Sequence, residues 1–167
     1  MSRGAMVSVA IVVATASMIG SASAGAAGAP RTLSYLEVMT TFDGVGGYNP
    51  ETTQAPPSVG QGFTFASTLY KWAGTKKGAP LGHDQVVCTV TTEDLSTGSV
   101  SLQCVATEFL PGGTIQLAGS SNFDNPVTNV AAVGGTGRYA GAQGTARIRS
   151  IGGENSSNSS YVIHITS

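Results

Sequence analysis

The chain has 167 residues, of which only 10% are charged, and its formal net charge is −1 at pH 7. Eight lysines and arginines are too few to form the basic stripe that neutralises phosphates, which argues against nucleic-acid binding. Twenty-three glycines, with short β-branched runs between them, are typical of an extracellular all-β domain.

The N-terminus has the order of a secretory signal peptide. A basic start at Met1–Arg3 precedes an apolar run over Ala5–Ile19, and Ala22–Ala24 supplies an A-x-A cleavage site. We therefore predict a signal peptide over 1–24, a short linker over 25–32 and a β-barrel domain over 33–167. The alternative is a retained membrane anchor, but the run is shorter than the roughly 20 apolar residues that cross a bilayer. The expected location is extracellular, with no stable membrane anchor.

Alternating and β-branched segments predict eight strands, separated by turns rich in glycine, proline and asparagine. The expected ranges are 33–41, 60–72, 81–93, 99–110, 113–123, 128–133, 143–150 and 160–166. No segment after the signal peptide shows a 3.6-residue apolar period. A closed antiparallel barrel accounts for eight strands best, because closure removes the exposed strand edges.

Two connections stand out. The segment Asp43–Ser58 is long for a compact domain, and is interpreted either as a lid over a cavity or as a surface loop. The segment 73–80 is predicted to be a turn with a lysine pair at its tip.

A glycine-rich stretch between the sixth and seventh predicted strands is expected to turn a sharp barrel corner. Its glycines are Gly134, Gly135, Gly137, Gly141 and Gly144. Part of the stretch fits a relaxed dinucleotide-binding fingerprint. That fingerprint needs a helix directly afterwards, whereas residues 143–150 alternate as a strand, which argues against nucleotide binding.

Cys88 and Cys104 are the two cysteines of the chain. They lie symmetrically about a predicted hairpin, so an antiparallel register places them opposite each other, within disulfide reach. An exported protein folds under oxidising conditions, and we predict a disulfide between them. The alternative, a catalytic thiolate, lacks a basic partner nearby in sequence.

Glu37 is the candidate catalytic residue. It lies inside the first predicted strand, with Tyr35 and Met39 two residues away on the same face. If this face lines the barrel interior, desolvation raises the pKa of the carboxyl group and suits it to proton transfer. The alternative is that Leu36 and Val38 face the core and Glu37 faces solvent.

Other candidates for chemistry are weak. His83 and Asp84 are neighbours in a strand, so their side chains point to opposite faces and form no dyad. The histidines and cysteines show no metal-ligand spacing, and we expect neither a metal nor a cofactor.

Four segments, over 59–70, 80–90, 113–119 and 133–144, resemble the allene oxide cyclase and dirigent barrel superfamily, and the glycine-rich corner is the most specific of them. The resemblance implies a small β-barrel with a hydrophobic lumen. The superfamily includes cyclases of fatty-acid epoxides, dirigent proteins that steer phenoxy-radical coupling, and bacterial cyclases that fold polyketide chains.

The resemblance also suggests which residues lie in the lumen. Glu37 falls where the plant cyclases have an acidic lumen residue, and Cys88 falls where they have a cavity cysteine. Met39, Ser67 and Ser121 stand where those enzymes use Asn, Asn and Tyr, so most of their polar set is missing. The expected ligand-lining residues are Tyr35, Glu37, Met39, Phe63, Phe65 and Cys88.

The function expected from these features is that of a secreted barrel which binds a small hydrophobic molecule in its lumen. It is predicted to act as a cyclase, an isomerase or a dirigent-type template, without a cofactor. The alternative is a non-catalytic extracellular carrier or interaction domain on the same barrel. The resemblance also implies a homodimer or homotrimer formed through the outer barrel faces.

Overall fold

A computed structural model describes residues 30–49, 51–53, 55–94, 96–122, 125–152 and 158–166. The predicted signal peptide, 1–24, lies outside these residues. Among them, no helix is long and apolar enough to cross a membrane.

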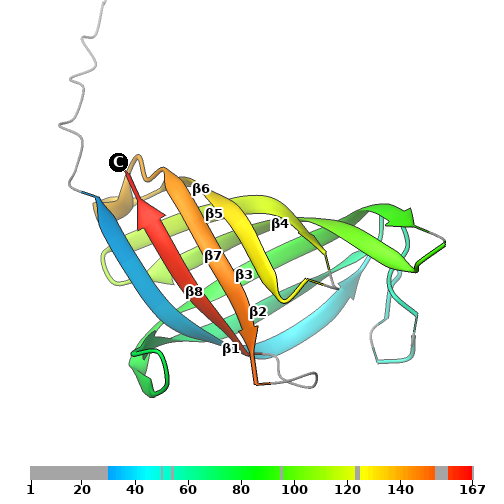
Figure 1. Ribbon diagram of the computed structural model, residues 1–167, viewed down its shortest axis with the longest axis horizontal. Coiled ribbons are helices and arrows are strands. Elements are labelled where there is room, and N and C mark those ends of the chain that lie inside the picture. The colour runs from blue at the N-terminus through cyan, green and yellow to red at the C-terminus, as the bar shows by residue number, and fades with distance from the viewer. Residues whose placement is uncertain are drawn as a thin grey trace, which may run out of the picture.

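Eight antiparallel strands form a closed barrel in which every strand pairs with its neighbours in the sequence (Figure 1). The strands are β1 (Arg31–Val45), β2 (Gly62–Trp72), β3 (Lys77–Asp94), β4 (Ser99–Leu110), β5 (Gly113–Asn122), β6 (Val127–Gly135), β7 (Gly144–Ile151) and β8 (Asn158–Ile165). Strand β8 closes the barrel on β1, from Arg31 opposite Ile165 to Val38 opposite Asn158. The predicted fold class is confirmed.

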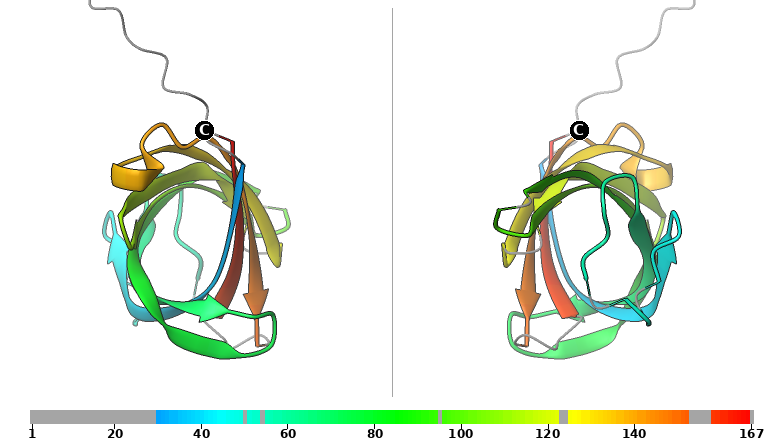
Figure 2. Two further views of the ribbon diagram at one scale, coloured as in Figure 1. Left: turned by 90° about the vertical axis from the view of Figure 1, so that its left-hand side faces the viewer. Right: turned by 90° about the vertical axis from the view of Figure 1, so that its right-hand side faces the viewer.

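The barrel has two ends, which we call the mouth and the base (Figure 2). At the mouth, β1 ends and β2 begins, and the connections β3–β4, β5–β6 and β7–β8 lie there. At the base lie the start of β1, the connections β2–β3 and β4–β5, the short helix η1 (Gly137–Tyr139) and the end of β8.

Two predicted boundaries were wrong. Strand β1 continues to Val45, so the first residues of the predicted 43–58 loop are strand. Strand β3 begins at Lys77, inside the predicted 73–80 turn. Pro80 is tolerated there because the β2–β3 register shifts on both sides of Tyr70, its partner, so the ladder is already irregular.

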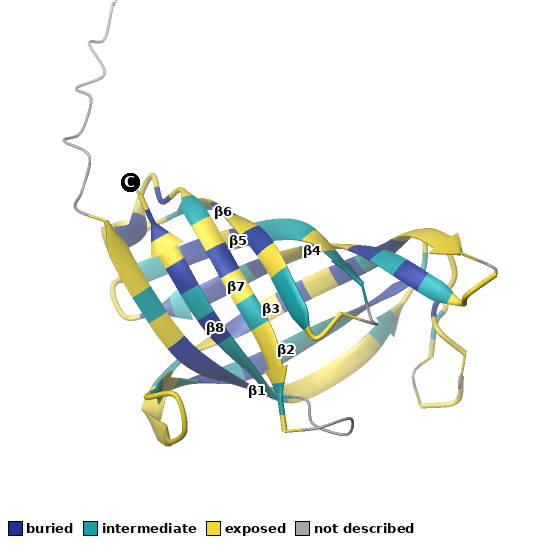
Figure 3. Cartoon of the chain, viewed as in Figure 1, coloured by how far each residue is buried: buried dark blue, intermediate teal, exposed yellow. Residues whose placement is uncertain are grey.

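The interior is defined largely by alternation along the strands (Figure 3), although β1 buries three consecutive residues at 35–37. On β3, Asp84, Val86 and Cys88 are buried, whereas His83 and Gln85 are exposed. This places one face of each strand in the core and the other in solvent.

The predicted disulfide is present. Cys88 pairs directly with Cys104 across β3 and β4, with the sulfur atoms 2.02 Å apart and the Cα atoms 4.1 Å apart. Cys88 is buried, so the bond links the two strands on the inner face of the barrel.

The glycine-rich corner between β6 and β7 contains only the single turn of helix η1, and a strand follows it. Gly137, Gly141 and Gly144 have positive φ angles. At Gly137, with a φ of +59°, a Cβ atom would lie 2.1 Å from the carbonyl oxygen of Gly112. Gly134 differs from these, because a Cβ atom there would meet nothing within 4 Å.

This contrast makes a matched pair of variants. We expect Gly137→Ala to lower the free energy of unfolding by about 2 kcal/mol or more, because the left-handed conformation and the contact with Gly112 both penalise a side chain. Gly134→Ala should change it by less than about 0.5 kcal/mol. Urea denaturation of both variants measures the difference, and equal stabilities would contradict this account of the corner.

Candidate functional site

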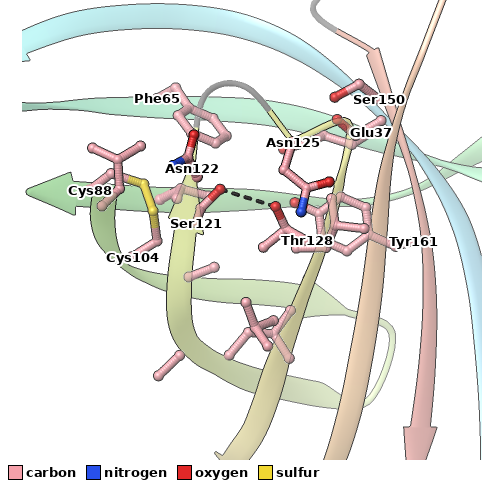
Figure 4. A pocket seen from close by; sticks show the side chains of 18 of the residues that line it. Glu37, Phe65, Cys88, Cys104, Ser121, Asn122, Asn125, Thr128, Ser150 and Tyr161 are labelled. Atoms are coloured by element: carbon pink, nitrogen blue, oxygen red, sulfur yellow. Dashed lines mark hydrogen bonds between the residues drawn. A yellow bond between two sulfur atoms is a disulfide. The ribbon is translucent and has the colours of Figure 1, made fainter. Parts of the chain in front are cut away.

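A cavity of about 220 Å³ lies inside the barrel on the side of the mouth (Figure 4). Its wall is mostly apolar and is formed by Phe63, Phe65, Val86, Leu102, Ala106, Leu117, Ala118, Val130, Ile148 and the Cys88–Cys104 disulfide. Small uncharged polar residues complete the lining, namely Ser121, Asn122, Asn125, Thr128, Ser150 and Ser159. Such a cavity suits a small, largely apolar molecule that carries a few polar groups.

Glu37 is the only described lining residue with an acidic or basic side chain. It is 3% exposed, and the hydroxyl group of Ser67 donates a hydrogen bond of 3.1 Å to its Oε1. Of the two orientations that the sequence left open, the structure therefore has the inward one. Figure 4 shows Glu37 beside Tyr161, with the disulfide on the opposite side of the cavity.

Two further carboxyl groups are buried with Glu37. Asp84 and Glu108 are both 0% exposed, and they lie opposite each other on β3 and β4. Asp84 also pairs with Ser67 on β2, which places the hydroxyl group that contacts Glu37 next to it. We call Glu37, Asp84 and Glu108 the carboxyl cluster.

Burial, followed by the negative charge of Asp84, raises the pKa of Glu37 to about 8. Burial also raises the pKa of Asp84, and it raises that of Glu108 well above the usual range. The oxygen atoms of Asp84 and Glu108 have no well-aligned hydrogen-bond donor among the described residues, although Ser67 lies near Asp84, and Tyr35 near Glu108, closely enough to lower the respective pKa values. Two ionised carboxylates cannot hydrogen-bond to each other, so burial of Glu37 beside Asp84 favours a proton on this pair. With its pKa raised to about 8, Glu37 is mainly protonated at neutral pH, and its carboxyl group lies in the cavity wall.

A pair of tyrosines lies next to the carboxyl cluster. The rings of Tyr35 and Tyr161 stack with their centroids 5.0 Å apart. Burial, and then the nearby carboxylates, raises the pKa of both phenols well above the usual value. Both remain neutral at ordinary pH, and only Tyr161 lines the cavity.

The structure separates the residues predicted to line the lumen. Glu37, Phe63, Phe65 and Cys88 lie in the cavity wall, whereas Tyr35 and Met39 do not. Tyr35 is fully buried beneath the cavity, and Met39 is half-buried next to a register shift in β1. The shift follows Met39, which still pairs with the buried Ser67, so the regular register reaches Met39 although its side chain does not line the cavity.

The predicted lid does not contact the cavity. No described residue of the 43–58 segment lines it, and Pro57 of that segment is fully buried. The backbone carbonyl of Gly46 accepts a hydrogen bond of 3.3 Å from the side chain of Gln61, which ties the two ends of this connection together.

Sequence reasoning missed Asp84 and Glu108. The prediction that His83 and Asp84 point to opposite faces is correct, since His83 is exposed and stacks on Phe109 with the ring centroids 4.5 Å apart. The same alternation placed Asp84 with Val86 and Cys88, and Glu108 with Ala106 and Leu110. The sequence therefore did offer a signal for these residues, namely an acidic residue two positions from apolar residues that face the core. Within the described residues, no three of His, Cys, Asp or Glu are arranged to hold a metal ion.

Comparisons with known proteins agree with this architecture. A family model described as "Dirigent-like protein" matches residues 37–166. Similar solved structures include a pyocyanin demethylase, with a TM-score of 0.64 and 18% identity over 81% of this chain and 100% of that one. A pterocarpan synthase dirigent protein has a TM-score of 0.63 and 19% identity over 81% of this chain and 83% of that one. An exo-specific intermolecular Diels–Alderase has a TM-score of 0.61 and 20% identity over 82% of this chain and 99% of that one. These identities show a shared fold alone, and no curated protein sequence matches the chain.

The raised pKa of Glu37 makes stability depend on pH. Between about pH 4.5 and about pH 8 the folded state holds a proton that the unfolded state has released, so the free energy of unfolding falls as pH rises. The slope is about 1.4 kcal/mol per pH unit for each such proton. We expect Glu37→Gln to reduce the decrease of the free energy of unfolding with pH. Glu93→Gln, at an exposed position, should leave that decrease unchanged. Urea denaturation at several pH values measures the slopes, and parallel curves for wild type and Glu37→Gln would be the contrary result.

Proposed function

Because the chain belongs to the dirigent-like protein family, we propose that its barrel binds a small, largely hydrophobic molecule and templates its cyclisation or coupling. Holding a flexible substrate in one folded conformer removes part of the entropic barrier, and that step needs neither a cofactor nor a nucleophile. The observation that supports this proposal most directly is the Glu37 carboxyl group in the wall of an otherwise uncharged cavity.

Glu37 would act as a hydrogen-bond donor or general acid. With a pKa raised to about 8 it is protonated at neutral pH, and it can donate to a carbonyl or developing enolate oxygen of the substrate. Ser67 donates a hydrogen bond to one of its oxygens, and in the absence of substrate its proton would be directed at Asp84. The proton returns to the pair after the reaction, so the step needs no external acid.

The similar structures support a template role without defining the substrate. They include a dirigent protein and a Diels–Alderase built on the same barrel. What this chain shares with them is the fold, and the apolar wall described above gives that fold a place to hold a substrate.

We also propose that the protein is exported, with cleavage after Ala24. The buried disulfide is compatible with an oxidising compartment. N-terminal sequencing of the mature protein should begin at Gly25. The homodimer or homotrimer stays a prediction, for which the paired outer-face residues Val87 and Val105, 49% and 51% exposed, are a candidate contact that sedimentation would test.

Substitution of the cavity acid tests the chemistry. We expect Glu37→Gln to slow product formation about 100-fold, since a positioned general acid contributes about this factor. Suitable substrates are a linear diene with a tethered electron-poor alkene, and a phenol supplied with a one-electron oxidant, with products resolved by chiral chromatography.

Glu93→Gln is the control and should keep wild-type rates. Unchanged turnover in Glu37→Gln would remove this residue from the mechanism. A protein that binds these substrates and never alters the rate or the product distribution would be a carrier instead.

Filling the cavity tests the binding site. Ala106 lies in the cavity wall, and its neighbour Val105 points outward from the same strand. We expect Ala106→Phe to weaken binding of the neutral fluorescent probe N-phenylnaphthylamine, because the added ring occupies part of the cavity. Val105→Phe should bind it as wild type does.

Thermal denaturation checks that the Ala106 variant folds, and Ala106→Leu provides a milder change if it does not. Equal probe affinity in the folded Ala106 and Val105 variants would place the ligand elsewhere.

A further inference from the structure

Exposed charged residues are unevenly distributed between the two ends of the barrel. The described exposed acids, Asp43, Glu51, Glu93 and Asp94, all lie at the mouth. Five of the seven described basic residues, Arg31, Lys71, Lys76, Lys77 and Arg138, lie at the base, where no described acidic side chain is exposed, whereas Arg147 and Arg149 lie along β7 toward the mouth. A formal net charge of −1 therefore conceals a positive end, and such an end attracts anions.

A second hollow of about 410 Å³ lies at this positive end, and we call it the base groove. Its lining includes Leu33, Leu81, Leu110 and Tyr139, together with the basic residues Lys71 and Arg138. The base groove shares no lining residue with the cavity described above. The stacked tyrosines separate the two, since Tyr35 lines the groove and Tyr161 lines the cavity.

Arg138 is held in place without an ion pair to any described residue. Its guanidinium group lies over the ring of Tyr139, 5.2 Å from the centroid. Its methylene groups pack against Gly112, where a Cβ atom would come within 2.4 Å of Cδ. The backbone carbonyl of Arg138 accepts a hydrogen bond of 3.5 Å from the side chain of Arg31. No described carboxylate pairs with the guanidinium group, whose planar donors match a carboxylate.

No described acidic side chain is exposed at the groove to oppose an anion. The nearest described acid along β4 is Glu108, two residues before Leu110, and it is fully buried. Lys71 supplies a second positive charge at the groove, from β2, where it lies opposite Tyr35 in the strand register. The groove thus combines an apolar floor with two cations at its edge.

We propose that the base groove is a second ligand site, which binds the carboxylate of a small organic acid at Lys71 and Arg138 and its apolar body against Leu33, Leu81 and Leu110. The site lies at the opposite end of the barrel from the cavity. Its existence does not depend on the function proposed for that cavity.

Octanoate and its neutral analogue octan-1-ol serve as probes for calorimetry and for amide chemical-shift mapping. We expect octanoate to bind the full barrel more tightly than octan-1-ol, with shifts at residues 110–113 and 137–139. The double variant Lys71→Gln/Arg138→Gln should weaken octanoate binding about tenfold or more, because charge-assisted hydrogen bonds are lost. Arg147→Gln/Arg149→Gln, two exposed charges on β7, is the matched control and should bind as wild type.

The Ala106→Phe variant separates the two sites and should retain octanoate binding. Loss of octanoate binding in that variant, with no loss in Lys71→Gln/Arg138→Gln, would assign the anion to the cavity and overturn the proposal. Equal affinity for octanoate and octan-1-ol would also overturn it, because the cations would then have no role. Binding to anionic phospholipid vesicles without binding to octanoate would show a membrane-facing surface instead of a small-molecule site.

Discussion

The chemistry proposed for this barrel depends on three carboxyl groups that a closed sheet has removed from water. Glu37, Asp84 and Glu108 are each no more than 3% exposed. No described cation lies among them, so the interior cannot hold three full negative charges. The favourable arrangement keeps protons on the cluster and stacks two neutral tyrosines against it. The acid that faces the cavity is thus a consequence of burial, and the proposed chemistry makes use of that constraint.

The same cluster also divides the barrel interior. Toward the mouth it leaves an apolar cavity in which Glu37 is the only carboxyl group among the described lining residues, whereas toward the base Tyr35 closes the interior beneath the base groove. The described exposed acids at the mouth, and most of the described exposed bases at the other end, add a second asymmetry. A barrel of this kind can hold two different ligands, one largely apolar and one anionic, without the two sites sharing a residue.

Much of the fold could be predicted because alternation and turn chemistry are local properties. The eight strands, the Cys88–Cys104 disulfide and the strand after the glycine corner all follow from spacing within a few residues. The carboxyl cluster could not be predicted in this way. Asp84 and Glu108 meet only through the β3–β4 register, and Glu37 joins them through Ser67 on a third strand. The β1 irregularity after Met39 was equally invisible, because no glycine or proline marks it.

The most direct test is the titration of the Glu37 side chain itself. The carboxyl carbon can be followed by NMR from pH 4 to pH 10, with Glu37→Gln used to assign its resonance. The account predicts a midpoint near 8, together with a second, smaller response as the neighbouring acids titrate. A single transition near pH 4.5 would show an ordinary solvated carboxylate, and it would contradict both the buried cluster and the proposed acid.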